Sequence, residues 1–159
     1  MPRTKSNEQI LAELQRLYDL GYRGHVDFVD DNLIGNRKSL RVFLPLLKQW
    51  QEAHGYPFEF STEASINLSD DDELMRMLKA CNFWLIFIGI ESPDPETLVQ
   101  MRKKQNTRRN LAESVHRIYS YGIAVTAGFI VGFDSEKASI GDSMAAFIDD
   151  CAVPVAMVG

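Results

Sequence analysis

Strand-like and helix-like segments alternate along the whole chain, and this alternation constrains the fold more than any other feature. Five short apolar runs have the composition of buried strands. Each begins roughly 30 to 40 residues after the last, which is the length of one strand–helix unit. The five runs are residues 25–30, 58–62, 84–90, 125–131 and 153–158. Near-continuous apolar strands separated by helices predict an α/β fold with a parallel sheet that helices cover.

The segments between the runs carry the residues that begin helices. Ser6 and Gln9 have the spacing of a capping box and precede an apolar stripe. Asn36 is placed to cap the helix after the first run. Ser69 is expected to open the third helix, with three aspartates in its first turn, where the helix dipole favours negative charge.

The composition is that of a soluble globular domain. A length of 159 residues suits one domain, and the apolar fraction of 45% and charged fraction of 25% are ordinary. A net charge of −5 gives no electrostatic footprint for a nucleic-acid partner. No apolar run approaches the roughly 20 residues of a membrane helix, and no secretory signal opens the chain. We therefore expect a cytoplasmic protein without a transmembrane segment.

The two cysteines are expected to be buried rather than chemically active. Cys81 and Cys151 lie 70 positions apart, each near the end of a helical apolar stripe. Cysteines of this kind are more often small hydrophobic core residues than members of a disulfide or a metal site.

In a parallel sheet, functional residues gather beyond the carboxyl ends of the strands. Here those ends are unusually acidic: the first run leads into Asp30–Asn32, the second into Glu63, and the third into Glu91 and Ser92. Capping of the following helix explains aspartates elsewhere in the chain. It does not explain Glu63 and Glu91, because each closes an apolar strand several residues before any helix.

The residues alone leave two function classes open. Asp31, Glu63 and Glu91 offer the hard oxygen ligands of a divalent metal ion, which predicts a metal-dependent (β/α)-barrel enzyme. The lack of a histidine or lysine base at the strand ends weighs against it. Two basic clusters, residues 102–104 and 108–109, suggest a nucleic-acid patch, although a charge run is usually a solvated face.

Two glycines interrupt the fourth apolar run. A glycine inside a strand marks a place where another backbone or a ligand approaches closely. The pattern Gly128-Phe-Ile130-Val-Gly132, followed by an acidic residue, resembles the fifth-strand adenine-contacting motif of radical S-adenosylmethionine (radical SAM) enzymes. The stretch Phe87-Ile-Gly-Ile-Glu91-Ser, earlier in the chain, resembles the end of the fourth strand in the same family.

The resemblance implies an architecture. The chain is similar to strands two to six of a radical SAM domain, a six-stranded partial barrel of the TIM type. It is then a single partial domain over residues 1–159, with the first strand absent and truncated at both ends. The implied cofactors are S-adenosylmethionine and a four-iron–four-sulfur (4Fe–4S) cluster.

The resemblance also implies residue roles toward S-adenosylmethionine. Asp30, Asp31 and Asn32 stand where many members receive the amino group, and Glu91 stands where the ribose hydroxyls are held. Lys103 is the positional match for the partner of the methionyl carboxylate, with Lys104 and Arg109 as alternatives. The remaining residues expected at the cofactor are Glu63, Ser92, Gly128, Ile130 and Gly132.

The chain departs from the family pattern at its most characteristic motif. The triplet Cys-x-x-x-Cys-x-x-Cys, which holds the cluster, is absent. The chain as it stands is therefore expected to be inactive.

The sequence of residues 89–98 resembles that of the radical SAM branch whose members carry an upstream cobalamin-binding domain. That branch implies methylation or cyclisation of a bulky, lipid-like or tetrapyrrole substrate.

Overall fold

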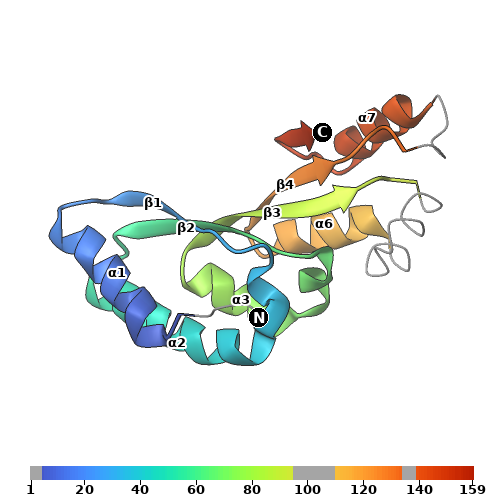
Figure 1. Ribbon diagram of the computed structural model, residues 1–159. Helices are drawn as coiled ribbons and strands as arrows, with labels where there is room; N and C mark the ends of the chain where they lie inside the picture. The colour runs from blue at the N-terminus through green and yellow to red at the C-terminus, as the bar shows by residue number, and fades with distance from the viewer. Residues whose placement is uncertain (1–4, 95–109, 134–138) are drawn as a thin grey trace.

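Five parallel strands form one curled sheet, a half-barrel, in the computed structural model, which describes residues 5–94, 110–133 and 139–159. The strands follow one another across the sheet in chain order. They are β1 (Gly24–Phe28), β2 (Phe58–Glu63), β3 (Phe83–Glu91), β4 (Ala124–Phe129) and β5 (Ala156–Val158). The predicted parallel α/β half-barrel is confirmed (Figure 1).

Helices alternate with these strands and cover one face of the sheet. The helices are α1 (Asn7–Asp19), α2 (Arg37–Ala53), α3 (Asp72–Ala80), α6 (Leu111–Ser120) and α7 (Ile140–Asp150). Two short 3₁₀ segments, Leu33–Asn36 and Ile66–Asp70, precede α2 and α3. Figure 1 shows α1, α2, α3 and α6 together below the sheet. None of the helices in the described residues combines the length and apolar character that a bilayer crossing needs.

The expected helix starts are confirmed at two places and corrected at a third. Ser6 and Gln9 form the reciprocal capping box of α1, and the Asn36 side chain accepts from the backbone N–H of Ser39 at the start of α2. Ser69 does not open the third helix. It lies buried in the 3₁₀ segment, and Asp71 is the residue that caps α3.

Asp71 also joins α2 to α3. Its carboxylate accepts hydrogen bonds from Arg41 at 2.7 Å and from Arg37 at 3.1 Å, in addition to the N–H of Leu74 at 3.0 Å. Burial alone would raise the pKa of Asp71, but the Leu74 N–H and the two guanidinium groups outweigh it and hold that pKa below its ordinary value.

The two faces of the sheet have different neighbours. Along β3, Ile86, Ile88 and Ile90 are fully buried against the helices, whereas Leu85 and Phe87 point to the opposite face and are half-buried. We call that opposite face, on the inside of the curl, the concave face. The positions on it, from the alternation and the register, are His25, Asp27, Glu59, Ser61, Glu63, Leu85, Phe87, Gly89, Ala124, Thr126, Gly128 and Met157. Trp84 lies at an irregularity of the β2–β3 register, and its indole N–H donates to His25 on this face.

Two strands are shorter than the sequence predicts. β4 ends at Phe129 rather than at residue 131, and β5 covers only residues 156–158 of the predicted 153–158. Pro154 lacks the N–H that a ladder hydrogen bond needs, so it excludes the first part of that run from the sheet. Gly132 has a φ of 102°, which bends the chain away after β4.

Candidate functional site

The acidic strand ends lie at one edge of the sheet, as predicted, but at different heights. Glu63 at the end of β2 pairs with Phe87, and Glu91 lies four residues further along β3. At the usual rise per residue of a strand, Glu91 stands about 13 Å beyond Glu63. The edge is therefore a rising rim, with Glu63 low and Glu91 high.

The segment after β1 forms a turn that is fixed to the segment after β2. The carboxylate of Asp30 accepts from the backbone N–H of Asn32 at 2.8 Å. The side-chain oxygen of Asn32 accepts from the N–H of Ser65 at 3.1 Å and from its hydroxyl at 3.3 Å. Asp31 is exposed between them. The turn presents carboxylate oxygens beside a rigid loop, which suits a ligand ammonium group.

Glu91 has an unusual backbone. Its φ is 71°, in the left-handed region, and the register with β4 shifts between Gly89 and Glu91, which marks a bulge. The N–H of Ile130 donates to the Glu91 carbonyl at 2.8 Å and holds this geometry against the end of β4. Such conformations cost about 1–3 kcal/mol in residues other than glycine and cluster at functional sites. The bulge re-aims the carboxylate, which is half-buried.

Ser92 has a structural role. It is fully buried, its N–H donates to the carbonyl of Ile90 at 3.0 Å, and its hydroxyl accepts from the N–H of Asp94 at 3.1 Å. These bonds close the turn that follows Glu91, and contact of Ser92 with the cofactor stays a prediction.

The close approach predicted at Gly128 occurs, but the group that approaches is a side chain of the protein. A Cβ added to Gly128 would lie 2.6 Å from Cζ of Phe87. Gly128 is buried, and its register partner on β3 is Gly89. The structure thus explains this glycine by the Phe87 ring, and contact between its backbone and a ligand stays a prediction.

Ile130 and Gly132 lie just beyond β4 rather than within it. Ile130 is 39% exposed, and the N–H of Val131 donates to the carbonyl of Gly159 at 3.0 Å. The φ of 102° at Gly132 requires a glycine, because a Cβ there would be strained. This segment adjoins Glu91 through the Ile130 N–H and exposes backbone at the rim.

Several predicted residues lie outside the described part of the chain. They are Lys103, its alternatives Lys104 and Arg109, and both basic clusters suggested for nucleic acid. Their predicted roles are neither supported nor opposed by the structure.

The metal-enzyme alternative finds no support in the geometry. Within residues 5–94, 110–133 and 139–159, no three histidine, cysteine, aspartate or glutamate side chains come together as a metal site. Glu63 and Glu91 are separated along the sheet, as described above, and Asp31 is on an exposed turn.

The two cysteines are buried and free, as predicted. Cys81 follows α3 and Cys151 follows α7. Burial raises the pKa of the Cys81 thiol to about 12 and that of Cys151 to about 11. The sequence has only these two cysteines, both buried, whereas the cluster-binding motif has three, so the residues of this chain do not fit a 4Fe–4S cluster.

A polar group on the concave face was missed by the sequence reasoning. His25 and Asp27 of β1 and Ser61 of β2 are hydrogen-bonded together. The spacing of two residues between His25 and Asp27 was the available signal, because it places both side chains on one face of a strand.

The chain is similar in sequence to proteins of one family. The family model described as the radical SAM superfamily matches residues 1–146. An uncharacterized methyltransferase of Synechocystis sp. is 50% identical over 96% of this chain, which spans 28% of that protein. A hopanoid C-2 methylase of Rhodopseudomonas palustris is 40% identical over 97% of this chain and 29% of its own length. The chain thus spans under a third of these curated relatives.

A solved structure has the same fold. The radical S-adenosylmethionine methyltransferase TsrM of Kitasatospora setae, described with cobalamin and a [4Fe–4S] cluster bound, superposes with a TM-score of 0.77. The superposition covers 98% of this chain and 31% of TsrM, at 15% sequence identity. At that identity the likeness shows the architecture, a radical SAM half-barrel, and not the substrate.

Proposed function

Because this chain belongs to the radical SAM superfamily, a family of enzymes, we propose that it forms the S-adenosylmethionine-binding part of an enzyme that cleaves this cofactor reductively. Membership implies S-adenosylmethionine and a 4Fe–4S cluster as cofactors. The reduced cluster would supply one electron to S-adenosylmethionine, whose bond between sulfur and C5′ would break to give methionine and a 5′-deoxyadenosyl radical. The ligands of the cluster are not among this chain's cysteines, so we assign only binding and orientation to its residues.

The observation that carries this proposal is the geometry of Glu91. A half-buried carboxylate stands at the high point of the rim, in a left-handed backbone conformation fixed by the N–H of Ile130. A carboxylate can accept hydrogen bonds from both ribose hydroxyls. The segment 130–132 beside it exposes backbone for the adenine, and the Asp30–Asn32 turn offers oxygen acceptors to the ammonium group.

The proposed outcome of the radical chemistry is methylation of a bulky apolar substrate. Both curated relatives described above are methyltransferases by name, and one of them is a hopanoid methylase. The structural neighbour is described with cobalamin bound, so we extend cobalamin dependence to the whole protein as part of this proposal.

The test uses the full-length protein that contains this chain, prepared anaerobically with its cluster reconstituted. Incubation with S-adenosylmethionine and a chemical reductant should yield 5′-deoxyadenosine, measured by liquid chromatography and mass spectrometry. Glu91→Gln should lower kcat/KM for S-adenosylmethionine about 10- to 100-fold, as expected for lost hydrogen bonds to a charged acceptor. Glu59→Gln, a carboxylate lost low on β2 and away from Glu91, is the matched control. Activity that requires Mg²⁺ and is lost in Asp31→Asn would instead favour the metal enzyme.

A further inference from the structure

Four side chains form a continuous hydrogen-bonded chain across β1, β2 and β3 on the concave face. The indole N–H of Trp84 donates to Nδ1 of His25 at 3.2 Å, and Nε2 of His25 lies 3.0 Å from the hydroxyl of Ser61. The hydroxyl of Ser61 donates to the carboxylate of Asp27. Ser61, at the centre of the chain, is only 7% exposed, whereas His25 and Asp27 on either side of it are exposed.

The direction of every bond in this chain is fixed. A serine has one O–H, and Ser61 gives it to Asp27, so Nε2 of His25 must carry the proton that reaches Ser61. Nδ1 is then the acceptor that the Trp84 indole requires. All three donors therefore lead to Asp27, which is the terminal acceptor of the chain.

The carboxylate of Asp27 can accept further hydrogen bonds. Its side chain is exposed on the concave face, and Ser61 is its one hydrogen-bond partner among the described residues. An ionised carboxylate offers about four acceptor positions. Glu59 and Glu63 share the face, and none of the five strands contains a lysine or arginine. The face therefore selects a ligand group that donates a hydrogen bond and disfavours an anion.

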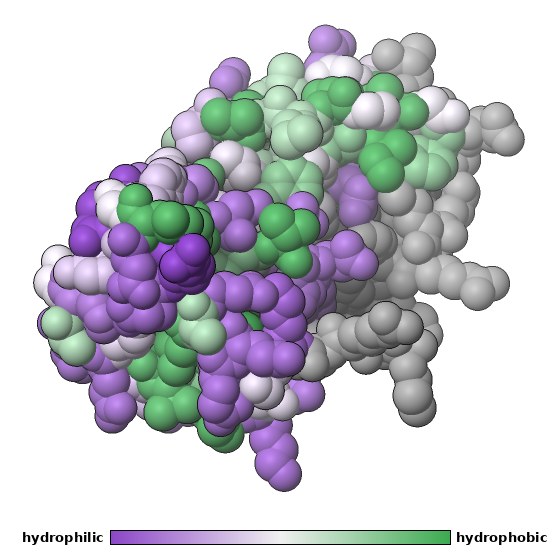
Figure 2. All heavy atoms as spheres, turned by 60° about the vertical axis from the view of Figure 1, so that its left-hand side comes forward, coloured by the Kyte–Doolittle hydropathy of each residue, from purple (hydrophilic) through white to green (hydrophobic). Residues whose placement is uncertain are grey.

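The part of the concave face that β3, β4 and β5 form is largely apolar. Leu85 and Phe87 line it from β3, and Met157, 60% exposed, lines it from β5. Figure 2 shows hydrophobic side chains gathered in the upper part of the molecule, where Figure 1 places β4 and β5. This surface suits the body of an apolar molecule.

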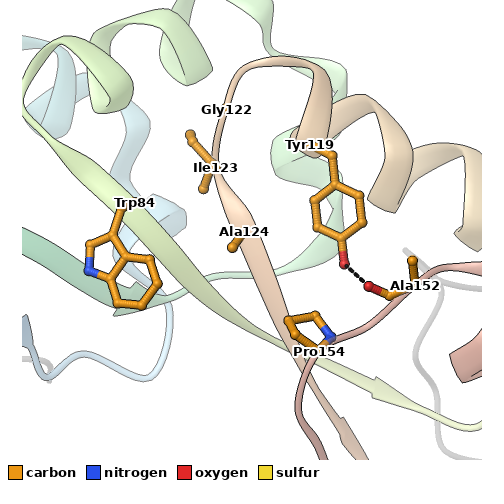
Figure 3. A pocket seen from close by; sticks show the side chains of 7 residues that line it. All are labelled: Trp84, Tyr119, Gly122, Ile123, Ala124, Ala152 and Pro154. Carbon is orange, nitrogen blue, oxygen red and sulfur yellow. Dashed lines mark hydrogen bonds between the residues drawn. The ribbon is translucent and has the colours of Figure 1, made fainter.

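An open pocket lies beside the low end of this surface. It has a volume of about 410 Å³ and lies between the beginnings of β3 and β4 and the segment before β5 (Figure 3). The Tyr119 hydroxyl donates to the carbonyl of Ala152 at 3.2 Å and closes one side. Trp84 lines the pocket, and its indole N–H begins the hydrogen-bonded chain, so the apolar pocket and the polar chain adjoin.

The acceptor Asp27 is close to the low part of the rim but far from Glu91. Asp27 pairs with Ser61 and Ser61 with Leu85, and Leu85 lies six residues before Glu91 on β3, which is about 20 Å of strand. A molecule that reaches from one to the other must therefore be long, and the surface along its length must tolerate an apolar body.

We propose that the concave face binds an elongated, largely apolar substrate by a donor group, a hydroxyl or a protonated amine, at the end remote from Glu91. Asp27 accepts this donor, and Trp84, His25 and Ser61 hold Asp27 in place. The reacting carbon then lies near Glu91. This inference rests on the proposed function and specifies its substrate class as a long apolar molecule with one terminal donor.

The test measures binding without cofactor or cluster, so its outcome is separate from that of the cleavage assay. The protein has two tryptophans, and Trp50→Phe leaves Trp84 as the sole indole reporter at the site. This variant is titrated with hexadecan-1-ol, hexadecan-1-amine and hexadecyl methyl ether, each delivered from cyclodextrin. The ether has the same chain and no donor. We expect the alcohol and the amine to bind about tenfold or more tightly than the ether, and the tighter of the two identifies the donor.

Variants locate the preference at Asp27. Asp27→Leu, of similar shape, should remove the advantage of the donors over the ether. Glu59→Gln removes a carboxylate from the same face that is not part of the hydrogen-bonded chain. This variant should still bind the alcohol and the amine more tightly than the ether. Equal binding of all three probes to the parent protein would overturn the proposal without any need of a variant. A preference that survives in a folded Asp27→Leu protein, checked by circular dichroism, would overturn it too.

Discussion

Replacement of Glu91 by glycine and, separately, by alanine distinguishes two properties of this residue. Both substitutions remove the carboxylate, but only glycine relieves the φ of 71°. The left-handed region costs a residue with a Cβ about 1–2 kcal/mol, and the greater freedom of glycine in the unfolded chain offsets about 0.5–1 kcal/mol of that gain. We therefore expect Glu91→Gly to be about 0.5–1 kcal/mol more stable than Glu91→Ala.

Glu63 provides the matched control. It ends β2 at the same edge of the sheet, is exposed, and does not have a positive φ. There the order should reverse, with glycine about 0.5–1 kcal/mol less stable than alanine. Equilibrium urea unfolding, followed by circular dichroism, measures all four variants.

The same variants separate stability from binding. In the full-length enzyme, both Glu91 substitutions should weaken the affinity for S-adenosylmethionine equally, because both lack the carboxylate. The reasoning is refuted if alanine is the more stable residue at position 91, since the left-handed backbone would then not exist in solution. Unequal affinities of the two Glu91 variants would show that backbone geometry, and not the carboxylate, holds the cofactor.

Three other predictions concern the fold. Gly128→Ala should destabilise the protein by about 1–3 kcal/mol in urea unfolding, because the new Cβ meets the Phe87 ring. Adding Phe87→Leu should restore part of the lost stability. An unchanged free energy of unfolding in Gly128→Ala would contradict this packing. Asp71→Asn should cost about 1–2 kcal/mol at neutral pH. Because the pKa of Asp71 is lowered in the folded state, this cost should shrink as the pH falls below about 4, and a cost independent of pH would be contrary evidence. Burial raises the pKa of Cys81 to about 12 and that of Cys151 to about 11, so both thiols should resist a thiol reagent at pH 8 until the protein is denatured. Anaerobic incubation of this chain with iron and sulfide should give no stoichiometric cluster absorption.

The fold could be predicted from the sequence because strand and helix signals agree along the chain. Apolar runs at the spacing of strand–helix units specify the parallel sheet, and the capping box at Ser6 and Gln9 appears as expected. The ends of the elements were less certain. The start of α3 depends on a 3₁₀ segment whose Ser69 is buried, and no local signal distinguishes Ser69 from Asp71 as the cap.

The candidate site could be predicted only in part. Strand order places Glu63 and Glu91 at the same edge, and this follows from parallel pairing alone. The difference in height and the positive φ of Glu91 come from a bulge between Gly89 and Glu91, which depends on pairing with a distant strand. The contact of Phe87 with Gly128 likewise joins two strands, and periodicity within one segment carries no information about it.

The central claim is that the rim around Glu91 and the end of β4 binds S-adenosylmethionine. The direct measurement is a titration of the isotope-labelled chain with S-adenosylmethionine, followed by nuclear magnetic resonance. Because the family's cluster normally holds the methionyl end, and this chain lacks its ligands, we expect binding no tighter than about millimolar. The amide signals that shift should be those of Glu91 and residues 128–132, and Glu91→Ala should abolish the shifts. Micromolar binding unaffected by Glu91→Ala, or shifts confined to other parts of the chain, would contradict the account.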